Sequence, residues 1–250
     1  MNAFLPLIAL VTALLVVTAT FGIAHLRGKY DTIDTAWGAG FAVIAAVSLV
    51  VGGISPVAVA LTAVWGVRLS WHLHRRNAGG PEDRRYAAML RKGKRPVLRM
   101  YARTYLTQAV AMWFVSLPVQ FSAPGAGAFT VAGVLVWLVG FGFEVVGDEQ
   151  LRRFRADPAN EGGVLDTGLW RYTRHPNYFG DACVWWGLYL IACQHWPGPL
   201  TVLSPLLMTW LLARGTGKPM LEKDIEQRRP GYADYVARTS GFVPLPPKRS

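Results

Sequence analysis

The sequence predicts an all-α integral membrane protein with seven transmembrane helices. Hydrophobic residues make up 52% of the 250 residues and charged residues only 16%, whereas soluble domains carry about 25% charged residues. Seven apolar segments follow one another, and Lys and Arg are concentrated in alternate connections between them. The segments lack the alternation of polar and apolar residues that a transmembrane strand would need. Helices are therefore the expected way of crossing the bilayer.

The predicted spans are apolar runs that approach the length of about 20 residues that a membrane helix needs. The first, residues 3–25, has no basic start and no small-residue cleavage site, so we expect a retained helix rather than a secretory signal. The last two are short and joined by a Pro-Gly-Pro turn, which predicts a tight hairpin. The remaining spans are expected at 33–53, 57–71, 105–121 and from about 129, with the hairpin at 182–196 and 199–215.

The connections predict the orientation. The turns "GGISP", "SAPGAGA" and "QHWPGP" contain no Lys or Arg, whereas residues 72–103, 151–174 and the tail after Lys218 are rich in both. With seven spans, all basic segments fall on one side, which the positive-inside rule makes cytoplasmic. The N-terminus is then outside and the C-terminus cytoplasmic, as expected for a multi-pass membrane protein. The formal charge of +11 reflects this topology and an anionic cytoplasmic ligand, not nucleic acid.

Ionisable residues near the cytoplasmic ends of the spans indicate a polar chamber. Burying such groups in a membrane costs several kcal/mol, so they mark functional sites by default. Each one alone is also compatible with a headgroup-level or capping position. His72 and His74 are not spaced i, i+4, and we expect no metal site. The residues are Asp34, His72, His74, Glu144 and Asp148.

The segment "GLWRYTRHPNYFGD" predicts an anion site. Arg171, Arg174 and His175 precede a helix whose N-terminus is expected after Pro176. A helix start is itself electropositive, so cations gathered there imply a bound phosphate or carboxylate. A headgroup-binding basic patch would also explain the arginines. The residues that follow are suited to a nucleotide, with an amide, a stacking ring and a hydroxyl acceptor supplied by Asn177, Tyr178 and Asp181.

This segment, together with "EDRRY", "DTAWG" and the tail "EKDIEQRRPGYADYVARTSGFVPLPPK", resembles the bacterial DUF1295 membrane proteins, a family related to steroid 5-alpha-reductases. The resemblance covers nearly the whole chain. It implies a single membrane domain over 1–250, with a cytoplasm-facing NADPH pocket in the later helices, 105–250. The early helices, 1–104, would line the cavity for a lipid substrate and carry the basic loop.

The resemblance also implies catalytic and cofactor-binding residues. "HLHR" stands where the reductases have Tyr-Phe-His-Arg, so His72 occupies the position of their catalytic Tyr. Asp34 is the best counterpart of their catalytic Glu, and Glu144 replaces an Asn that precedes the Asp148 and Arg155 pattern. The expected cofactor-binding residues are Arg75, Asp148, Arg155, Arg171, Arg174, His175, Asn177, Tyr178, Asp181, Glu222, Tyr235 and Arg238.

The implied function is NADPH-dependent reduction of an activated C=C bond in a hydrophobic lipid or steroid-like substrate. Such a reaction needs hydride delivery to the β carbon and an acid that polarises the carbonyl oxygen while enolate charge develops. We expect His72 to be this group, with Asp34 or Glu144 as its partner. Besides the substrate and membrane lipid, no nucleic acid and no obligate protein partner is expected.

Two alternatives remain open. "RHPNYFG" followed by "E-x-D…Y-x-x-Y…P" also resembles isoprenylcysteine carboxyl methyltransferases, which use S-adenosylmethionine. The number of arginines favours NADPH, whose phosphates require them. A non-enzymatic lipid-binding or transport protein is the second alternative, although transporters place polar groups near the midplane. In the methyltransferase the ligand would contact Arg174, His175, Pro176, Tyr178, Glu222 and Tyr235.

Overall fold

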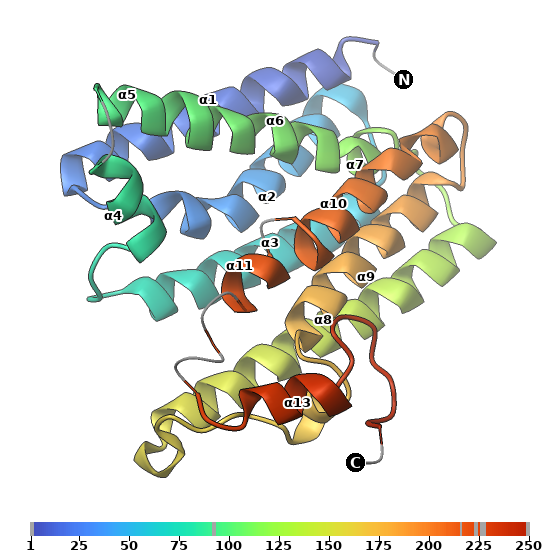
Figure 1. Ribbon diagram of the computed structural model, residues 1–250. Coiled ribbons are helices and arrows are strands. Elements are labelled where there is room, and N and C mark those ends of the chain that lie inside the picture. The colour runs from blue at the N-terminus through green and yellow to red at the C-terminus, as the bar shows by residue number, and fades with distance from the viewer. Residues whose placement is uncertain (1–2, 92–93, 216, 223–224, 226–228, 249–250) are drawn as a thin grey trace. The chain divides into compact units, whose positions relative to one another are not determined.

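The structure, a computed structural model, describes residues 3–91, 94–215, 217–222, 225 and 229–248. Within these ranges the chain is almost entirely helical (Figure 1), and its extended pairing is one isolated parallel bridge between Thr173 and Ser240. The chain forms two compact units. The first comprises Met1–Thr130 with Ile191–Ser204, and the second comprises Val131–Leu190 with Pro205–Ser250.

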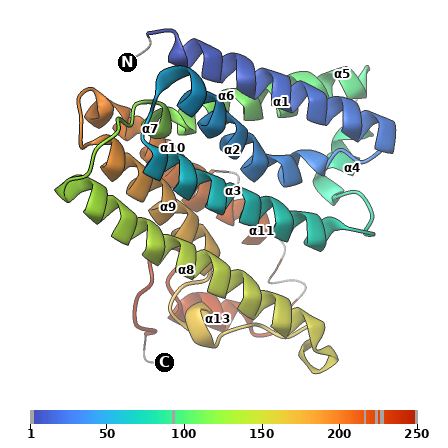
Figure 2. The same cartoon turned by 180° about the vertical axis from the view of Figure 1, so that it is seen from behind.

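The first unit is built on three long helices. The second helix packs against both the first and the third, and the first also packs against α6 (Figures 1 and 2). A shorter helix, α4, follows, and then a helical stretch with a π-helical turn at Tyr101–Tyr105. The helices are α1 (Leu5–Arg27), α2 (Thr32–Gly52), α3 (Pro56–Asn77), α4 (Arg84–Leu90), α5 (Pro96–Met100), α6 (Leu106–Val115) and α7 (Leu117–Gln120), with a 3-10 turn at Gly198–Val202.

Local sequence sets the ends of these helices. α1 and α2 end at Gly28 and Gly53, whose φ angles of 64° and 58° place them in the left-handed region that glycine adopts without a Cβ clash. α3 begins at Pro56, and the hydroxyl of Ser55 accepts a hydrogen bond from the amide nitrogen of Ala58 (3.4 Å).

The second unit contains the longest helix and the C-terminal helices. α8 covers Ala128–Ala156, and α9 covers Pro176–Ala192, so it begins at Pro176 itself, next to the start that the sequence predicted. The indole nitrogen of Trp186 on α9 donates to the hydroxyl of Thr209 on α10 (3.1 Å), which confirms the expected hairpin. The other elements are α10 (Leu203–Ala213), α11 (Lys218–Glu222), α13 (Tyr232–Arg238) and 3-10 turns at Pro158–Asn160 and Gly168–Arg171.

The helices support the predicted class of membrane protein. Every predicted span lies mainly in helical structure. Among the described residues, α1, α2 and α8 are long and apolar enough to cross a membrane. Large apolar side chains are exposed along α1 and α8, where lipid would cover them. α3 has 22 residues but carries Arg68 and two histidines, whereas α9 and α10 have 17 and 11 residues. The count of seven spans and the orientation stay predictions.

Candidate functional site

α8 and α9 are in backbone contact along a line of glycines. Gly140 and Gly147 on α8 are seven residues apart, as are Gly180 and Gly187 on α9, so each pair lies on one helix face. A Cβ at Gly140 would lie 2.5 Å from the carbonyl oxygen of Gly180, and a Cβ at Gly180 would lie 2.6 Å from the amide nitrogen of Glu144. Side chains beside these glycines are therefore brought close to the facing helix.

The first polar contact between the two helices joins Asp148 and Asn177. The side-chain nitrogen Nδ2 of Asn177 donates to Oδ1 of Asp148 (3.1 Å), and Asp148 is only 6% exposed. Because the amide nitrogen faces Asp148, the Oδ1 atom of Asn177 faces away from it. That oxygen is buried and accepts no hydrogen bond from the described residues. A buried acceptor without a donor costs roughly 1–3 kcal/mol, which makes it a place where a ligand donor fits.

Glu144 and Asp181 extend this polar region by one turn. Glu144 precedes Asp148 by four residues on α8, and Asp181 follows Asn177 by four on α9. Both residues are buried, at 3% and 8% exposure. The α8–α9 contact therefore carries three carboxyl groups and one amide next to apolar helix surface. All four belong to the set of residues predicted from sequence.

A second cluster is formed by Arg174, His175 and Glu222. Nε of Arg174 donates to Oε1 of Glu222 (2.9 Å), and Nε2 of His175 lies 2.9 Å from the same oxygen. Lys218 approaches the other carboxylate oxygen at 3.8 Å, and the hydroxyl of Tyr232 lies 3.4 Å from Oε1. The anion that Arg174 and His175 require is thus a carboxylate of the protein itself, supplied by α11.

The electrostatics of this cluster follow from burial and hydrogen bonding. Burial raises the pKa of the Glu222 carboxyl, but hydrogen bonds from His175 and Arg174 outweigh it and lower the pKa to about 2. Burial lowers the pKa of the His175 imidazole, and its hydrogen bond to Glu222 opposes that shift only in part. Glu222 therefore stays ionised near neutral pH and neutralises the buried Arg174.

Arg174 also connects three segments of the chain. Nη1 donates to the carbonyl oxygens of Val236 (3.2 Å) and Thr239 (2.7 Å), and the backbone nitrogen of Arg174 donates to Ser240 (2.9 Å). The guanidinium thus joins the loop before α9 to α11 and to the end of α13. Its donors are bonded within the protein, so its role in this structure is to fix the C-terminal segment.

Two predicted tyrosines lie beside this cluster. The ring of Tyr178 stacks on His175 with centroids 5.4 Å apart and an interplanar angle of 12°. The hydroxyl of Tyr235 donates to the carbonyl oxygen of Trp170 (2.6 Å). The indole nitrogen of Trp170 in turn donates to the carbonyl oxygen of Gly147 (3.0 Å). Tyr235 therefore anchors α13 to the loop before α9 and, through Trp170, to α8.

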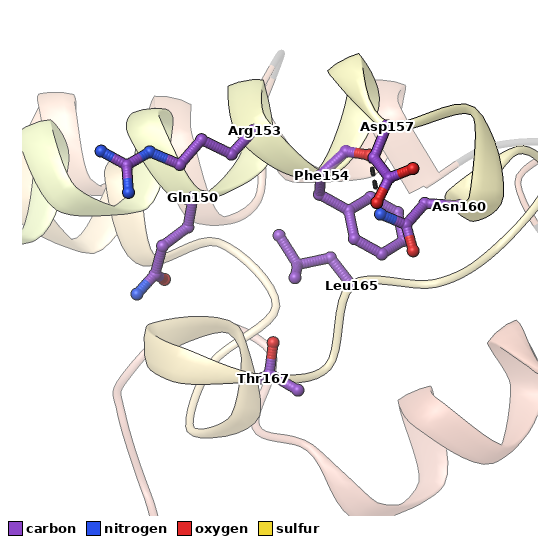
Figure 3. A pocket seen from close by; sticks show the side chains of 7 residues that line it. All are labelled: Gln150, Arg153, Phe154, Asp157, Asn160, Leu165 and Thr167. Carbon is purple, nitrogen blue, oxygen red and sulfur yellow. Dashed lines mark hydrogen bonds between the residues drawn. The ribbon is translucent and has the colours of Figure 1, made fainter.

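Arg171 and Arg238 lie elsewhere in the second unit. Together with Lys248 they line a cavity of about 540 Å³, which also includes Asp166, the ion-pair partner of Arg238. A neighbouring cavity of about 340 Å³ shares Thr167 with it. The rest of its lining is formed by Gln150, Arg153, Phe154, Asp157, Asn160 and Leu165 (Figure 3). The predicted cofactor residues of the second unit therefore fall into separate groups, and their arginines do not all line one binding site.

In the first unit, Asp34 is held by the motif "EDRRY". The hydroxyl of Tyr86 donates to Oδ1 of Asp34 (2.6 Å), and Nη2 of Arg85 donates to Oδ2 (3.2 Å). Glu82 accepts hydrogen bonds from the backbone nitrogens of Tyr30 (2.5 Å) and Asp31 (2.9 Å) just before α2. Burial, and then the charge of Asp34, raises the pKa of the Tyr86 hydroxyl. The motifs "DTAWG" and "EDRRY" are thus two parts of one structure.

Three further predicted residues lie near helix ends. His72 is half-buried and Arg75 is exposed, both on the last turns of α3, and Arg155 is exposed on the last turn of α8. The pairing of His72 with Asp34 or Glu144 stays a prediction, as does a cofactor contact by Arg75.

Sequence reasoning missed three residues that the structure places in these networks. Arg85 and Tyr86 hold Asp34, and Tyr232 reaches Glu222. Each lies in a motif that was identified, "EDRRY" or the C-terminal "GYADY". These residues could have been noticed as polar or aromatic side chains within recognisable motifs. Their partners lie 10 to 52 residues away in the chain, however, and the motif alone does not identify them.

A family model described as "Protein of unknown function (DUF1295)" matches residues 20–239. No curated protein and no solved structure matches the chain.

Proposed function

The chain belongs to the DUF1295 family, and on that premise we propose that it is a membrane reductase that uses NADPH. Its substrate is a hydrophobic lipid or steroid-like molecule, in which the enzyme reduces an activated C=C bond of the enone type. The resemblance to steroid 5-alpha-reductases and the polar groups at the α8–α9 contact support this proposal.

The orientation of Asn177 carries the proposal. Its amide nitrogen is bonded to Asp148, and its buried oxygen accepts nothing from the described residues. A carboxamide or hydroxyl of a nucleotide offers the missing N–H or O–H donor. When bound, NADPH supplies the hydride. The contribution of the chain is to hold the nucleotide through Asn177 and to fix the direction of that side chain through Asp148.

Arg155 extends the same helix face toward a phosphate. It follows Asp148 by seven residues on α8, which places it about two turns, or roughly 10 Å, farther along nearly the same face. Asp148 holds Asn177, which we expect to contact the base or amide end of the ligand. The exposed guanidinium of Arg155, farther along α8, then suits the phosphates of the same ligand.

The proposed acid is the residue that the resemblance implies. His72 is the group that we expect to donate a hydrogen bond to the substrate carbonyl oxygen, and Asp34 or Glu144 is its expected partner. Tyr86 and Arg85 both donate to Asp34, which fixes the position of that carboxyl group. Positioned carboxylates of this kind orient a histidine and stabilise its charged form.

The proposal includes a topology. Seven spans in a bacterial inner membrane, with the N-terminus outside and the C-terminus in the cytoplasm, place the ends of α3 and α8 and the start of α9 on the cytoplasmic side. Cysteine labelling from either side of the membrane tests it, since Cys183 and Cys193 are the only native thiols. An accessible periplasmic thiol introduced into residues 157–163 would contradict it.

An S-adenosylmethionine-dependent methyltransferase is the second candidate. It is favoured by the cluster that brings Arg174, His175 and Glu222 together, because the resemblance assigns these residues to that ligand. The carboxylate of Glu222 and the guanidinium of Arg174 are bonded to each other, however. Binding a ligand there would break a buried ion pair, so we place the reductase first.

Thermal stability with each ligand separates the candidates. At a concentration of 100 times its Kd, a ligand stabilises the folded state by about 2.7 kcal/mol. We expect NADPH to raise the melting temperature of the detergent-solubilised chain more than NADH does, and S-adenosylmethionine to leave it unchanged. Arg155→Gln should lose much of the NADPH effect, whereas the neighbouring exposed Arg152→Gln should keep it. Stabilisation by S-adenosylmethionine alone would establish the methyltransferase instead, and no effect of either ligand would contradict both enzymes.

A further inference from the structure

The cavity that contains Arg171, Arg238 and Lys248 is strongly basic. Its lining carries three cationic side chains and one carboxylate, that of Asp166. Arg238 is paired with Asp166. In the described part of the chain, no hydrogen bond or ion pair engages the side-chain nitrogens of Arg171 or Lys248. Two positive charges thus line one cavity whose lining carboxylate, Asp166, is already paired with Arg238, and this arrangement favours the binding of an anion between them.

The cations come from three segments that the backbone fixes relative to one another. The backbone nitrogen of Lys248 donates to the carbonyl oxygen of Arg238 (2.9 Å), which ties the tail to the end of α13. Arg171 ends the 3-10 turn that starts at Gly168, and Oε1 of Gln150 accepts a hydrogen bond from the backbone nitrogen of Leu169 in that turn (3.0 Å). Side chains on such fixed segments can contact one phosphate group together.

Exposed apolar side chains lie on the same segments. Tyr172 directly follows Arg171, and the backbone nitrogen of Leu245 donates to the carbonyl oxygen of Tyr172 (3.0 Å). Tyr172, Val243 and Leu245 are about half exposed. Single exposed apolar residues are ordinary, but here three of them accompany a basic cavity in a membrane protein. Apolar and tyrosine side chains next to cations are typical of surfaces that lie at the headgroup level of a bilayer.

We propose that this cavity binds the phosphate of an anionic phospholipid headgroup, with Arg171, Lys248 and Arg238 contacting the phosphate and Tyr172, Val243 and Leu245 contacting the lipid beside it. The site is distinct from Asn177 and Asp148, and it does not depend on the proposed reductase activity. It assigns Arg171 and Arg238, predicted from sequence to bind a cofactor, to the membrane instead.

Native mass spectrometry of the purified full-length chain, titrated with phosphatidylglycerol or phosphatidylcholine, tests the proposal without any nucleotide present. A cation near an anionic surface contributes about 1 kcal/mol, or about a fivefold change in affinity. The double variant Arg171→Gln with Lys248→Gln should therefore bind phosphatidylglycerol roughly 25-fold more weakly, with phosphatidylcholine binding unchanged. Arg152→Gln, an exposed arginine of α8 outside the cavity, should bind both lipids as the unmodified chain does.

Three outcomes overturn the proposal. One is phosphatidylglycerol binding by the double variant that equals that of the unmodified chain. Another is an equal loss in Arg152→Gln, which would show only a general effect of surface charge. The third is displacement of phosphatidylglycerol by inorganic phosphate at equal concentration, which would make the cavity a soluble-phosphate site. Should the double variant fold poorly, Lys248→Gln alone, near the chain end, is expected to show about a fivefold loss and decides the same question.

Discussion

The pairing of Arg174 with Glu222 allows a sharp prediction about stability. Glu222→Gln keeps the size of the side chain but removes the negative charge that faces Arg174. The Arg174 side chain is only 9% exposed and that of Glu222 19%, so the variant leaves a buried guanidinium without an anion. Breaking a buried ion pair in this way costs about 3–5 kcal/mol. We expect about 3 kcal/mol, because the Glu222 carboxyl keeps some exposure.

The expected loss is measurable by thermal unfolding in detergent, followed by the fluorescence of the ten tryptophans. For a domain of this size, about 3 kcal/mol corresponds to a decrease in Tm of roughly 6–12 °C. Glu149→Gln is the matched control, because Glu149 pairs with Arg152 and Arg153 on an exposed face of α8. Solvent and salt screen a surface pair of this kind, so it contributes little to stability, and the control should lower Tm clearly less than Glu222→Gln does.

A double variant and a pH series complete the test. Arg174→Met combined with Glu222→Gln removes both charges, so its loss should be smaller than the sum of the two single losses. The pKa of Glu222 is lowered from 4.5 to about 2, so its contribution is complete above about pH 4.5 and is lost as the pH falls toward 2. The difference in Tm between the unmodified chain and Glu222→Gln should shrink over that window. Additive losses, or a Glu222→Gln variant as stable as Glu149→Gln, would refute a buried ion pair here.

Three other predictions follow from the packing and from the proposed chemistry. Gly180→Ala should destabilise the fold by about 1–3 kcal/mol because its Cβ would overlap the backbone of α8. Gly142→Ala, which has open space around it inside α8, should not lower Tm, because alanine is the better helix former. Equal losses of Tm in the two variants would contradict the close α8–α9 contact. Tyr86→Phe should cost about 1–3 kcal/mol by removing a hydrogen bond to Asp34, seen as a lower Tm, and an unchanged Tm would contradict that bond. His72→Ala should slow NADPH oxidation with an enone by about 100-fold or more, and unchanged turnover would exclude His72 from the mechanism.

Much of the helical framework was predictable because its signals are local. The apolar run at 3–25 corresponds to α1 at Leu5–Arg27, and the run at 33–53 to α2 at Thr32–Gly52. A helix start was expected after Pro176, and α9 begins at Pro176 itself, because proline fits the first turn of a helix, where its missing N–H leaves no bond unmade. Helix ends at Gly28 and Gly53 follow from the same kind of local rule.

Membership of the functional site was only partly predictable. Asp148 and Asn177 were both identified, and the structure joins them through the glycine contact between α8 and α9. Arg171 and Arg174 look equivalent in the sequence, three residues apart in one basic segment. In the structure Arg174 is buried against Glu222, whereas Arg171 is exposed in a different cavity.

Which segments are helical and apolar can be read from the sequence, as can the need of the cations before α9 for an anion. Hydrophobicity and helix-end rules act over a few residues, so one chain is enough to apply them. The folded chain was needed to show that the anion facing Arg174 is Glu222, 48 residues later, and that Asp34 is held by Tyr86, 52 residues later. Charge and hydrogen-bonding capacity say that a partner is needed, but the packing of distant helices decides which group occupies that place.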